Sequence, residues 1–472
     1  MKKQQKKRYS DSFKIVKIIL IIYLVFPVFT LAGQDTWEAS SRKAFIKSVL
    51  EGSVFNTDSP PTGLAEGKIA TYDPMLVTIT ASVKSRLPGR DDSQWTEVEL
   101  PPSLTDPDSS LICPNPFKAL IRHTTTSNPY TFVILPGAYS WGISFNNQTI
   151  AALDKKFDNP TIIIFTGYLS PVFLEGTCKE IPWNGAAIAK DFYLRLRVYL
   201  SEIKAQPEYT GVIGFSGGGG LAIGILGTDA QSSKINNGEN CFGLGGAVFS
   251  PTLHGRTIFE NLDTSIKGIA HSRVLTTVGP EWAEASHVWF LAKAMIANDW
   301  GLDWRDVINL YESGVQNFWE RSLNEFTYVD LKDTLTAVGF DIDQIKGEFG
   351  YYNTYINTGL RNTLKGIPSR MMTKAFLDKS YDTLQDANSF LDSVDRPLLI
   401  YFSQDDPILS SYDASGQPQA ITEILEQAEK NPNITVFNPR YGAHIGAFLD
   451  PVFDDLIHSV FIKGENSPSY LH

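Results

Sequence analysis

A serine, a pair of aspartates and a histidine stand far apart in the chain and could together carry out nucleophilic catalysis. Ser216 lies in the run GFSGGGG, Asp405 and Asp406 lie in QDDPI, and His444 lies in GAHIG. A serine hydroxyl becomes a good nucleophile when a base takes its proton, and imidazole is the side chain suited to that task near neutral pH. A carboxylate on the other ring nitrogen fixes the tautomer and stabilises the imidazolium as it forms. The order serine, acid, histidine therefore predicts a hydrolytic triad.

The serine is expected at a sharp turn that the surrounding glycines make possible. Gly214, Ser216 and Gly218 spell GxSxG, between the strand-like run Thr210 to Phe215 and the helix-compatible run Leu221 to Leu226. Such a turn strains its central residue, and neighbours without a Cβ avoid clashes. The pattern alone is weak, since a chain of this length would contain it by chance about 0.15 times. A phosphate-binding loop fits less well, because neither Lys-Ser nor Lys-Thr follows the glycines.

An oxyanion hole needs two converging N–H donors near this serine. Gly217 follows the serine directly and supplies one of them at the start of a predicted helix. The second is expected from Ala138 or its neighbour Tyr139, which follow Leu-Pro-Gly at the end of another predicted strand. The alternative for that segment is an ordinary proline-glycine turn.

Each of the proposed catalytic residues follows an apolar run that predicts a buried strand. These runs are continuous rather than alternating, and helix-like segments with one apolar face separate several of them. This pattern favours an α/β fold with a mainly parallel sheet and helices on both faces. Catalytic groups of such sheets gather at the carboxyl ends of the strands. The expected strands are Tyr130 to Leu135, Thr161 to Phe165, Thr210 to Phe215, Gly245 to Phe249, Pro397 to Phe402 and Ile434 to Phe437.

Composition divides the chain into four parts around this core. Residues 117–251 and 396–472 form the predicted core, and residues 33–116 form an N-terminal strand, expected at Leu76 to Val83, with an irregular extension. Residues 252–395 read as a helical insertion that holds five of the nine tryptophans. Those aromatic residues either pack within an inserted helical layer or line a cap over the active site. The position of the insertion, between the serine and acid strands, favours a cap.

The first 32 residues read as a signal peptide. A basic leader precedes the uncharged run Ile18 to Gly33, and small residues suit cleavage near Ala32 or Gly33. We therefore expect an exported protein, periplasmic or secreted, with a retained N-terminal membrane anchor as the alternative.

Charge and cysteine content limit the classes of partner. Loss of residues 1–32 would remove seven basic residues and Asp11 and change the formal net charge from −11 to −17. A chain this acidic has no general attraction to nucleic acid or an anionic membrane. Cys113, Cys178 and Cys241 show no CxxC metal spacing, and at most one disulfide can form among them, although three buried free thiols are an alternative.

The motifs GFSGG, QDDPI, GAHIG and LPGAYS resemble those of the α/β-hydrolase superfamily over about Tyr130 to the C-terminus. The resemblance implies hydrolysis through an acyl-enzyme, without cofactor or metal. The Asp-Pro-Ile turn of that family favours Asp406 as the acid, which leaves Asp405 as a solvated turn residue or the alternative acid. The histidine motif is similar to GGHxGF in a branch of lipid and ester hydrolases, with Ala443 and Ala447 as departures.

The resemblance leads us to expect a carboxylic ester hydrolase acting on a small-molecule or lipid ester, with transient lipid contact through the cap. Amide hydrolysis, acyl transfer and a secreted binding protein of the same fold are the alternatives. The sequence does not indicate an oligomeric state.

Overall fold

The computed structural model describes residues 39–64, 72, 74–85, 94–102, 113–124, 128–137, 146–167, 173, 176, 185–235, 240–253, 390–406, 409 and 419–462. The expected signal peptide, nearly all of the expected cap, and the proposed donors Ala138 and Tyr139 lie outside these residues.

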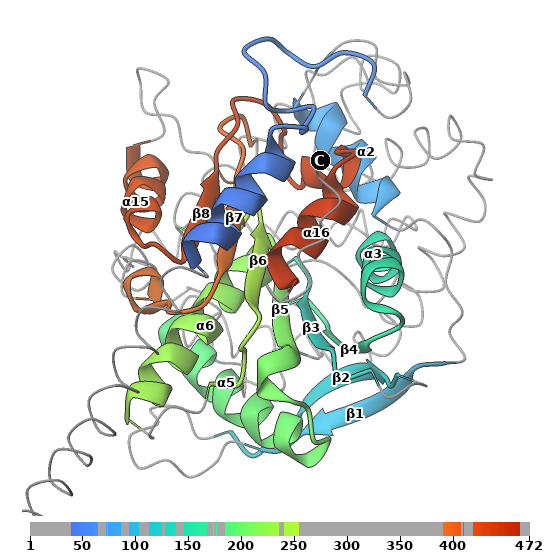
Figure 1. Cartoon of the computed structure of the whole chain (residues 1–472). Helices are drawn as coiled ribbons and strands as arrows, with labels where there is room; N and C mark the ends of the chain where they lie inside the picture. The colour runs from blue at the N-terminus through green and yellow to red at the C-terminus, as the bar shows by residue number, and fades with distance from the viewer. Residues whose placement is uncertain are drawn as a thin grey trace, which may run out of the picture.

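An eight-stranded sheet organises the described residues, in the order β1-β2-β4-β3-β5-β6-β7-β8 (Figure 1). Among these strands β2 runs antiparallel to both of its neighbours, and the strands from β4 to β8 are all parallel. The predicted mainly parallel sheet is therefore confirmed. The strands are β1 (Thr96–Leu100), β2 (Phe117–Arg122), β3 (Thr131–Leu135), β4 (Thr161–Phe165), β5 (Thr210–Phe215), β6 (Gly245–Phe249), β7 (Leu398–Tyr401) and β8 (Ile434–Phe437).

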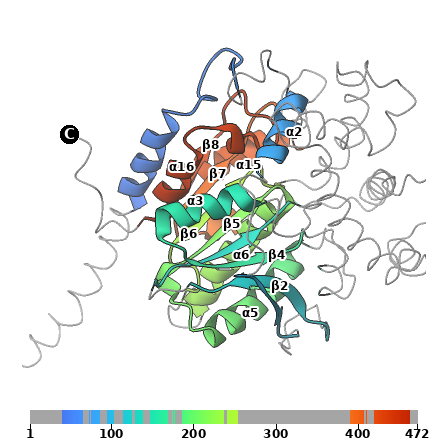
Figure 2. The ribbon, with the colours of Figure 1, turned by 90° about the vertical axis from the view of Figure 1, so that its right-hand side faces the viewer.

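Helices cover both faces of the sheet (Figure 2). One core layer lies beneath α3 and α16 and contains Ile162 and Ile164 of β4, whereas Ile163 and Phe165 belong to the layer beneath α5, α6 and α15. Since successive side chains of a strand point to opposite faces, a strand buried on both faces must be apolar throughout. The covering helices are α3 (Asn147–Phe157), α5 (Gly185–Glu202), α6 (Gly217–Ile235), α15 (Gln419–Lys430), α16 (Phe453–Phe461) and a helix over residues 39–50.

The strand expected at Leu76 to Val83 was wrong, because these residues belong to the helix α2 (Pro74–Lys84). The alternation of β-branched residues is also compatible with a helix in so short a window. Val77, Ala81 and Ser85 are buried at a spacing of four residues, which is helical. Pro74 occupies the first helical position, where a missing N–H costs nothing. The N-terminal edge strand lies instead at β1.

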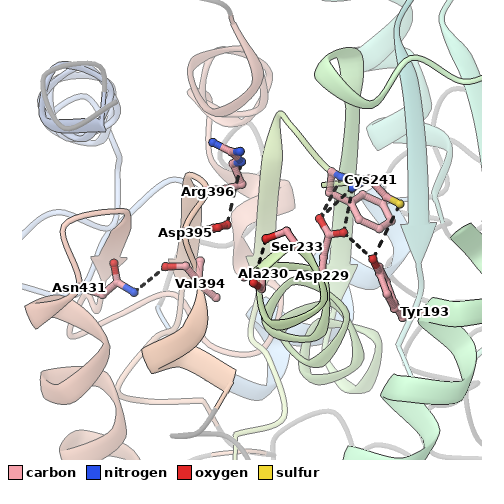
Figure 3. Close-up of polar contacts among 10 residues, drawn as sticks. Tyr193, Asp229, Ala230, Ser233, Cys241, Val394, Asp395, Arg396 and Asn431 are labelled. Carbon is pink, nitrogen blue, oxygen red and sulfur yellow. Dashed lines mark hydrogen bonds and ion pairs between the residues drawn. The ribbon is translucent and has the colours of Figure 1, made fainter. Parts of the chain in front are cut away.

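Four residues form a hydrogen-bonded group that we call the Asp229 cluster: Tyr193 on α5, Asp229 on α6, and Cys241 and Phe242 in the loop before β6. Figure 3 labels Tyr193, Asp229 and Cys241. The Asp229 carboxylate accepts hydrogen bonds from the N–H groups of Cys241 at 2.9 Å and Phe242 at 3.1 Å, and from the Tyr193 hydroxyl at 2.8 Å. Burial raises the pKa of Asp229, and these donors oppose that shift. Because β6 begins shortly after Phe242, the cluster lies where the parallel strands begin, which we call the amino edge of the sheet. Ser216, which follows β5, lies at the other edge, where these strands end.

The cysteines agree with the expectation of at most one disulfide. Cys113 is disulfide-bonded, whereas Cys241 keeps its thiol. Beside Cys113, the buried guanidinium of Arg195 donates to the Asn115 carbonyl at 2.7 Å and pairs with Asp191 at 2.8 Å, which fixes this segment on α5. No helix in the described part of the chain is long and apolar enough to cross a membrane.

Candidate active site

Four neighbouring strands end at the same level of the sheet and are followed by polar residues. Phe215 is in register with Phe249, Phe249 with Tyr401, and Tyr401 with Phe437, at the ends of β5, β6, β7 and β8. Because these strands are parallel, the residues that follow them meet at one edge. The polar residues that follow them include Ser216, Ser250, Asp405, Asp406 and His444.

Ser216 occupies a strained turn between β5 and α6. Its φ is 51°, in the left-handed region that residues with a Cβ rarely adopt. Its N–H donates to the Phe249 carbonyl at 2.9 Å, and its own carbonyl accepts from the N–H groups of Gly219 at 2.9 Å and Thr252 at 3.0 Å. These bonds attach the turn to β6 and to the first turn of α6, so the conformation is held from both sides.

The first turn of α6 packs directly on the end of β3. A Cβ on Gly218 would overlap the carbonyl oxygens of Leu135 and Pro136, so only glycine fits at this position. Gly217, the proposed first oxyanion donor, is the first residue of α6. The first N–H groups of a helix have no acceptor within it and can therefore bind a developing negative charge. The segment that leads to Ala138 begins where β3 meets this turn.

Asp406 and His444 are brought together in the way the proposed triad requires. The Oδ2 atom of Asp406 lies 2.7 Å from Nδ1 of His444, and its Oδ1 accepts from the Leu409 N–H at 2.9 Å. Asp406 is fully buried and His444 is 6% exposed, so water does not replace these partners. An ionised carboxylate only accepts hydrogen bonds, so with Asp406 in that form this bond requires the proton on Nδ1 and leaves Nε2 as an acceptor.

Asp405 has other partners, and its interpretation as a solvated turn residue was wrong. It is partly buried, its Oδ1 accepts from the Ala443 N–H at 2.8 Å, and its Oδ2 accepts from the Tyr72 hydroxyl. Burial raises the pKa of Asp405 to about 6; the hydrogen bonds from Tyr72 and Ala443 lower it, and the neighbouring Asp406 raises it further. Of the two aspartates, Asp406 contacts the imidazole.

The loop around His444, residues 442–445, which we call the histidine loop, is also strained. Ala443 has φ 54° and Ile445 has φ 52°, so left-handed residues flank the histidine on both sides. A β-branched residue at positive φ is a genuine outlier. The backbone of Ser250 also has a positive φ, of 46°, and its hydroxyl accepts a hydrogen bond from the Ile445 N–H at 2.9 Å. Strained residues of this kind cluster at functional sites, where the surroundings hold them in place.

Ser250 connects the histidine loop to the serine turn. Its own N–H donates to the Tyr401 carbonyl at 2.7 Å, and the residue before it, Phe249, accepts the N–H of Ser216. The expected strand Gly245 to Phe249 ends directly before Ser250, but no role was predicted for this serine. Its position could have indicated a role, because Ser250 directly follows β6, the strand that lies between the serine strand β5 and the acid strand β7.

The residues expected at the site thus have distinct outcomes. Ser216 and Gly217 form the turn after β5, Asp406 and His444 are hydrogen-bonded, Asp405 binds the backbone beside them, and Ala138 lies outside the described residues. Among the residues that the structure describes, no group of three histidine, cysteine or acidic side chains is arranged to hold a metal ion.

Comparison with known proteins gives only distant likenesses. No protein-family model and no curated protein sequence matches the chain. An esterase from Pyrococcus furiosus has a TM-score of 0.38 at 14% identity, over 85% of this chain and 95% of its own. An esterase/lipase from an uncultured bacterium has a TM-score of 0.36 at 12% identity, over 88% and 95%. A puromycin-hydrolyzing peptidase from Mycobacterium tuberculosis has a TM-score of 0.36 at 10% identity, over 78% and 39%. Likenesses this distant carry no information on the substrate.

Proposed function

We propose that this protein is a serine hydrolase that cleaves carboxylic esters through an acyl-enzyme. The observation that carries the proposal is the buried hydrogen bond between Asp406 and His444, at the sheet edge where Ser216 holds a left-handed turn. A buried carboxylate that orients an imidazole, at the same edge of the sheet as a strand-to-helix turn with a partly exposed serine, has the parts that acyl transfer needs.

In this mechanism Nε2 of His444 takes the Ser216 proton as Oγ attacks the ester carbonyl. The carbonyl π electrons move to oxygen, and the resulting oxyanion is bound by the N–H groups of Gly217 and Ala138. When the tetrahedral intermediate collapses, the ester C–O bond breaks and the leaving alcohol takes the proton from the imidazolium. Water then attacks the acyl-enzyme by the same steps and regenerates Ser216. Asp406 stays ionised and stabilises the imidazolium throughout.

The same proton transfer would serve an amine leaving group, so an ester and an amide compete as substrates at one site. We favour esters because the oxygen of an ester is a better leaving group than the nitrogen of an amide. Cleavage of an ester therefore depends less on proton donation by the imidazolium. Loss of one oxyanion donor in such a site lowers turnover by roughly 100- to 1000-fold, so we expect the Gly217 and Ala138 N–H groups to contribute to turnover beside the histidine base.

We also propose that the protein is exported. The basic leader followed by the uncharged run up to Gly33 supports this, and so does the disulfide at Cys113, since such bonds persist in oxidising compartments. Fractionation of cells that express the full chain, with N-terminal sequencing of the product, tests it. A product that retains residues 1–32 in the cytoplasm would contradict export.

The function is tested by labelling the full chain with a fluorophosphonate probe and by assaying chromogenic esters of increasing acyl length beside matched anilides. We expect labelling at Ser216 and ester hydrolysis, both lost in Ser216→Ala and His444→Ala. Ser201→Ala, which alters an exposed serine on α5, should behave like the unmodified protein. A folded protein that neither reacts with the probe nor cleaves any substrate would overturn the proposal and favour a binding protein.

A further inference from the structure

The histidine loop has four successive backbone N–H groups that are bound by side-chain oxygens instead of by a neighbouring strand. A loop with left-handed residues cannot join the sheet, so its N–H groups need other acceptors when they are buried. The four bonds are Gly442 to the Tyr72 hydroxyl at 2.7 Å, Ala443 to Asp405 at 2.8 Å, His444 to the Thr78 hydroxyl at 3.1 Å and Ile445 to the Ser250 hydroxyl at 2.9 Å.

Two of these four acceptors come from the N-terminal extension, more than 360 positions away in the sequence. Thr78 belongs to α2, which packs on the 3-10 turn η6 (Gly446–Leu449) directly after the histidine loop. Val77 of the same helix lies so close to Gly446 that an added Cβ would touch it at 3.4 Å. In Figure 1 α2 lies beside the C-terminal part of the chain, as these contacts require.

Each of the two hydroxyl groups acts both as donor and as acceptor. The Tyr72 hydroxyl accepts from Gly442 and donates to Asp405, which in turn binds the next N–H of the loop. The Thr78 hydroxyl accepts from His444 and donates to the Pro74 carbonyl at 2.8 Å. The lone pairs are therefore aimed at the loop by a second bond, which fixes the position of each acceptor.

We propose that Tyr72 and Thr78 are positioning residues that hold His444 in register with Ser216. The proposal rests on the hydrolytic function proposed above and gives the N-terminal extension a part in it. Left-handed residues on both sides of His444 are unfavourable by themselves, and such a conformation persists only when its surroundings over-determine it. Asp406 orients the imidazole ring through Nδ1, whereas the two hydroxyls fix the backbone from which the ring projects.

The hydroxyls can be removed with little change of shape. Tyr72→Phe keeps the ring, which packs edge-on against Tyr441 with centroids 5.3 Å apart. Thr78→Val keeps the branched side chain and loses the acceptor, while Thr78→Ser keeps the acceptor. Tyr130→Phe is the matched control, because it removes a phenol hydroxyl at the start of β3, on the opposite edge of the sheet.

The experiment compares kcat and KM for a chromogenic ester with hydrogen exchange of the peptide that covers residues 442–445, in the full chain. We expect the double variant Tyr72→Phe, Thr78→Val to lose roughly 10- to 100-fold in kcat with KM changed less than about twofold, because a misplaced base costs rate and not binding. Exchange at residues 442–445 should quicken. Thr78→Ser and Tyr130→Phe should match the unmodified protein in both measurements.

Unchanged kcat and unchanged exchange in a folded double variant would overturn the proposal. So would a rise in KM at constant kcat, since that would indicate contact with the substrate instead of positioning. If the unmodified protein neither hydrolyses esters nor reacts with the probe, the proposed function fails by that result alone. The exchange comparison then still decides whether the two hydroxyls hold the loop.

Discussion

The two edges of the sheet each hold a buried carboxylate with several hydrogen-bond donors, but the donors differ in kind. At the carboxyl edge Asp406 is bound by the His444 imidazole and one backbone N–H. At the amino edge Asp229 is bound by backbone N–H groups and the Tyr193 hydroxyl. Imidazole exchanges protons near neutral pH, whereas a phenol and a peptide N–H do not. The first carboxylate can therefore assist proton transfer, and the second can only hold structure.

The backbone differs in the same direction. Among the described residues, four at the carboxyl edge other than glycine have a positive φ. Three others, Asp158, Asn159 and Lys204, lie in loops before β4 and β5, but no member of the Asp229 cluster has a positive φ. Strain of this kind costs stability and is kept where function needs a fixed geometry. Under the proposed function, the carboxylate that matters is the one that is joined to a base on strained backbone. The strained residues are Ser216, Ser250, Ala443 and Ile445.

The largest expected effect comes from Asp406→Asn. The amide cannot hold the Nδ1–H tautomer of His444, so we expect kcat for esters to fall by about 10⁴-fold while the protein stays folded. The measurement is steady-state kinetics, with circular dichroism as the check on folding. Asp229→Asn is the control at the opposite edge and should leave kcat unchanged. Equal losses of kcat in the two variants would remove the distinction between the edges.

A pair of glycines tests the same contrast through the backbone. Gly218→Ala forces a methyl group into the carbonyl groups at the end of β3 and should displace the serine turn, with a loss of about 100-fold in kcat. Gly243→Ala meets Glu208 Cα and the Pro207 carbonyl oxygen at 2.8 Å, at the amino edge. We expect this second variant to lower the melting temperature without lowering kcat per folded molecule. A loss of kcat confined to Gly243→Ala would contradict the comparison.

Asp229→Asn should have a smaller and purely structural effect. Both carboxylate oxygens of Asp229 accept hydrogen bonds from backbone N–H groups. In Asp229→Asn the amide nitrogen would face one of these N–H groups and could not accept a hydrogen bond from it. We expect the free energy of unfolding to fall by about 1–3 kcal/mol, as for one buried donor left unsatisfied. Urea denaturation measures it, and Tyr193→Phe, which removes one donor, should cost less. An unchanged urea midpoint in both variants would show that the cluster does not stabilise the fold.

The strands and the acid-base pair could be predicted from the sequence because they depend on local signals. Continuous apolar runs gave β3 to β8 within one residue at each end, since strands buried on both faces need such runs. The two adjacent aspartates and His444 followed from their place after two of those strands, and the family resemblance favoured Asp406 of the two aspartates. β2 was missed because Lys118 interrupts its apolar residues and Arg122 ends it, and β1 was missed because it is an exposed edge strand.

The rest of the site could not be predicted, since it depends on contacts between distant segments. Nothing near Tyr72 or Thr78 indicates that their hydroxyls bind a loop more than 360 positions away. Asp405 was interpreted as a solvated turn residue because Asp406 was preferred as the acid, while the partner that covers Asp405 is Tyr72. Local propensity carries no information on such pairings, which exist only after the sheet and α2 have packed together.

The pH dependence of stability should distinguish Asp405 from its neighbour. Burial raises the pKa of Asp405 from 3.8 to about 6, so the folded state holds its proton more tightly than the unfolded state. This carboxyl then contributes stability below about pH 4 that is lost as the pH rises to about 6. Tyr72, Asp406 and Tyr401 are the titratable groups around it, and all remain in Asp405→Asn. We expect the melting temperature of the unmodified protein, relative to that variant, to decline between pH 4 and 6 and to level off above. A constant difference across that range would mean that Asp405 titrates alike in both states, as a solvated turn residue would.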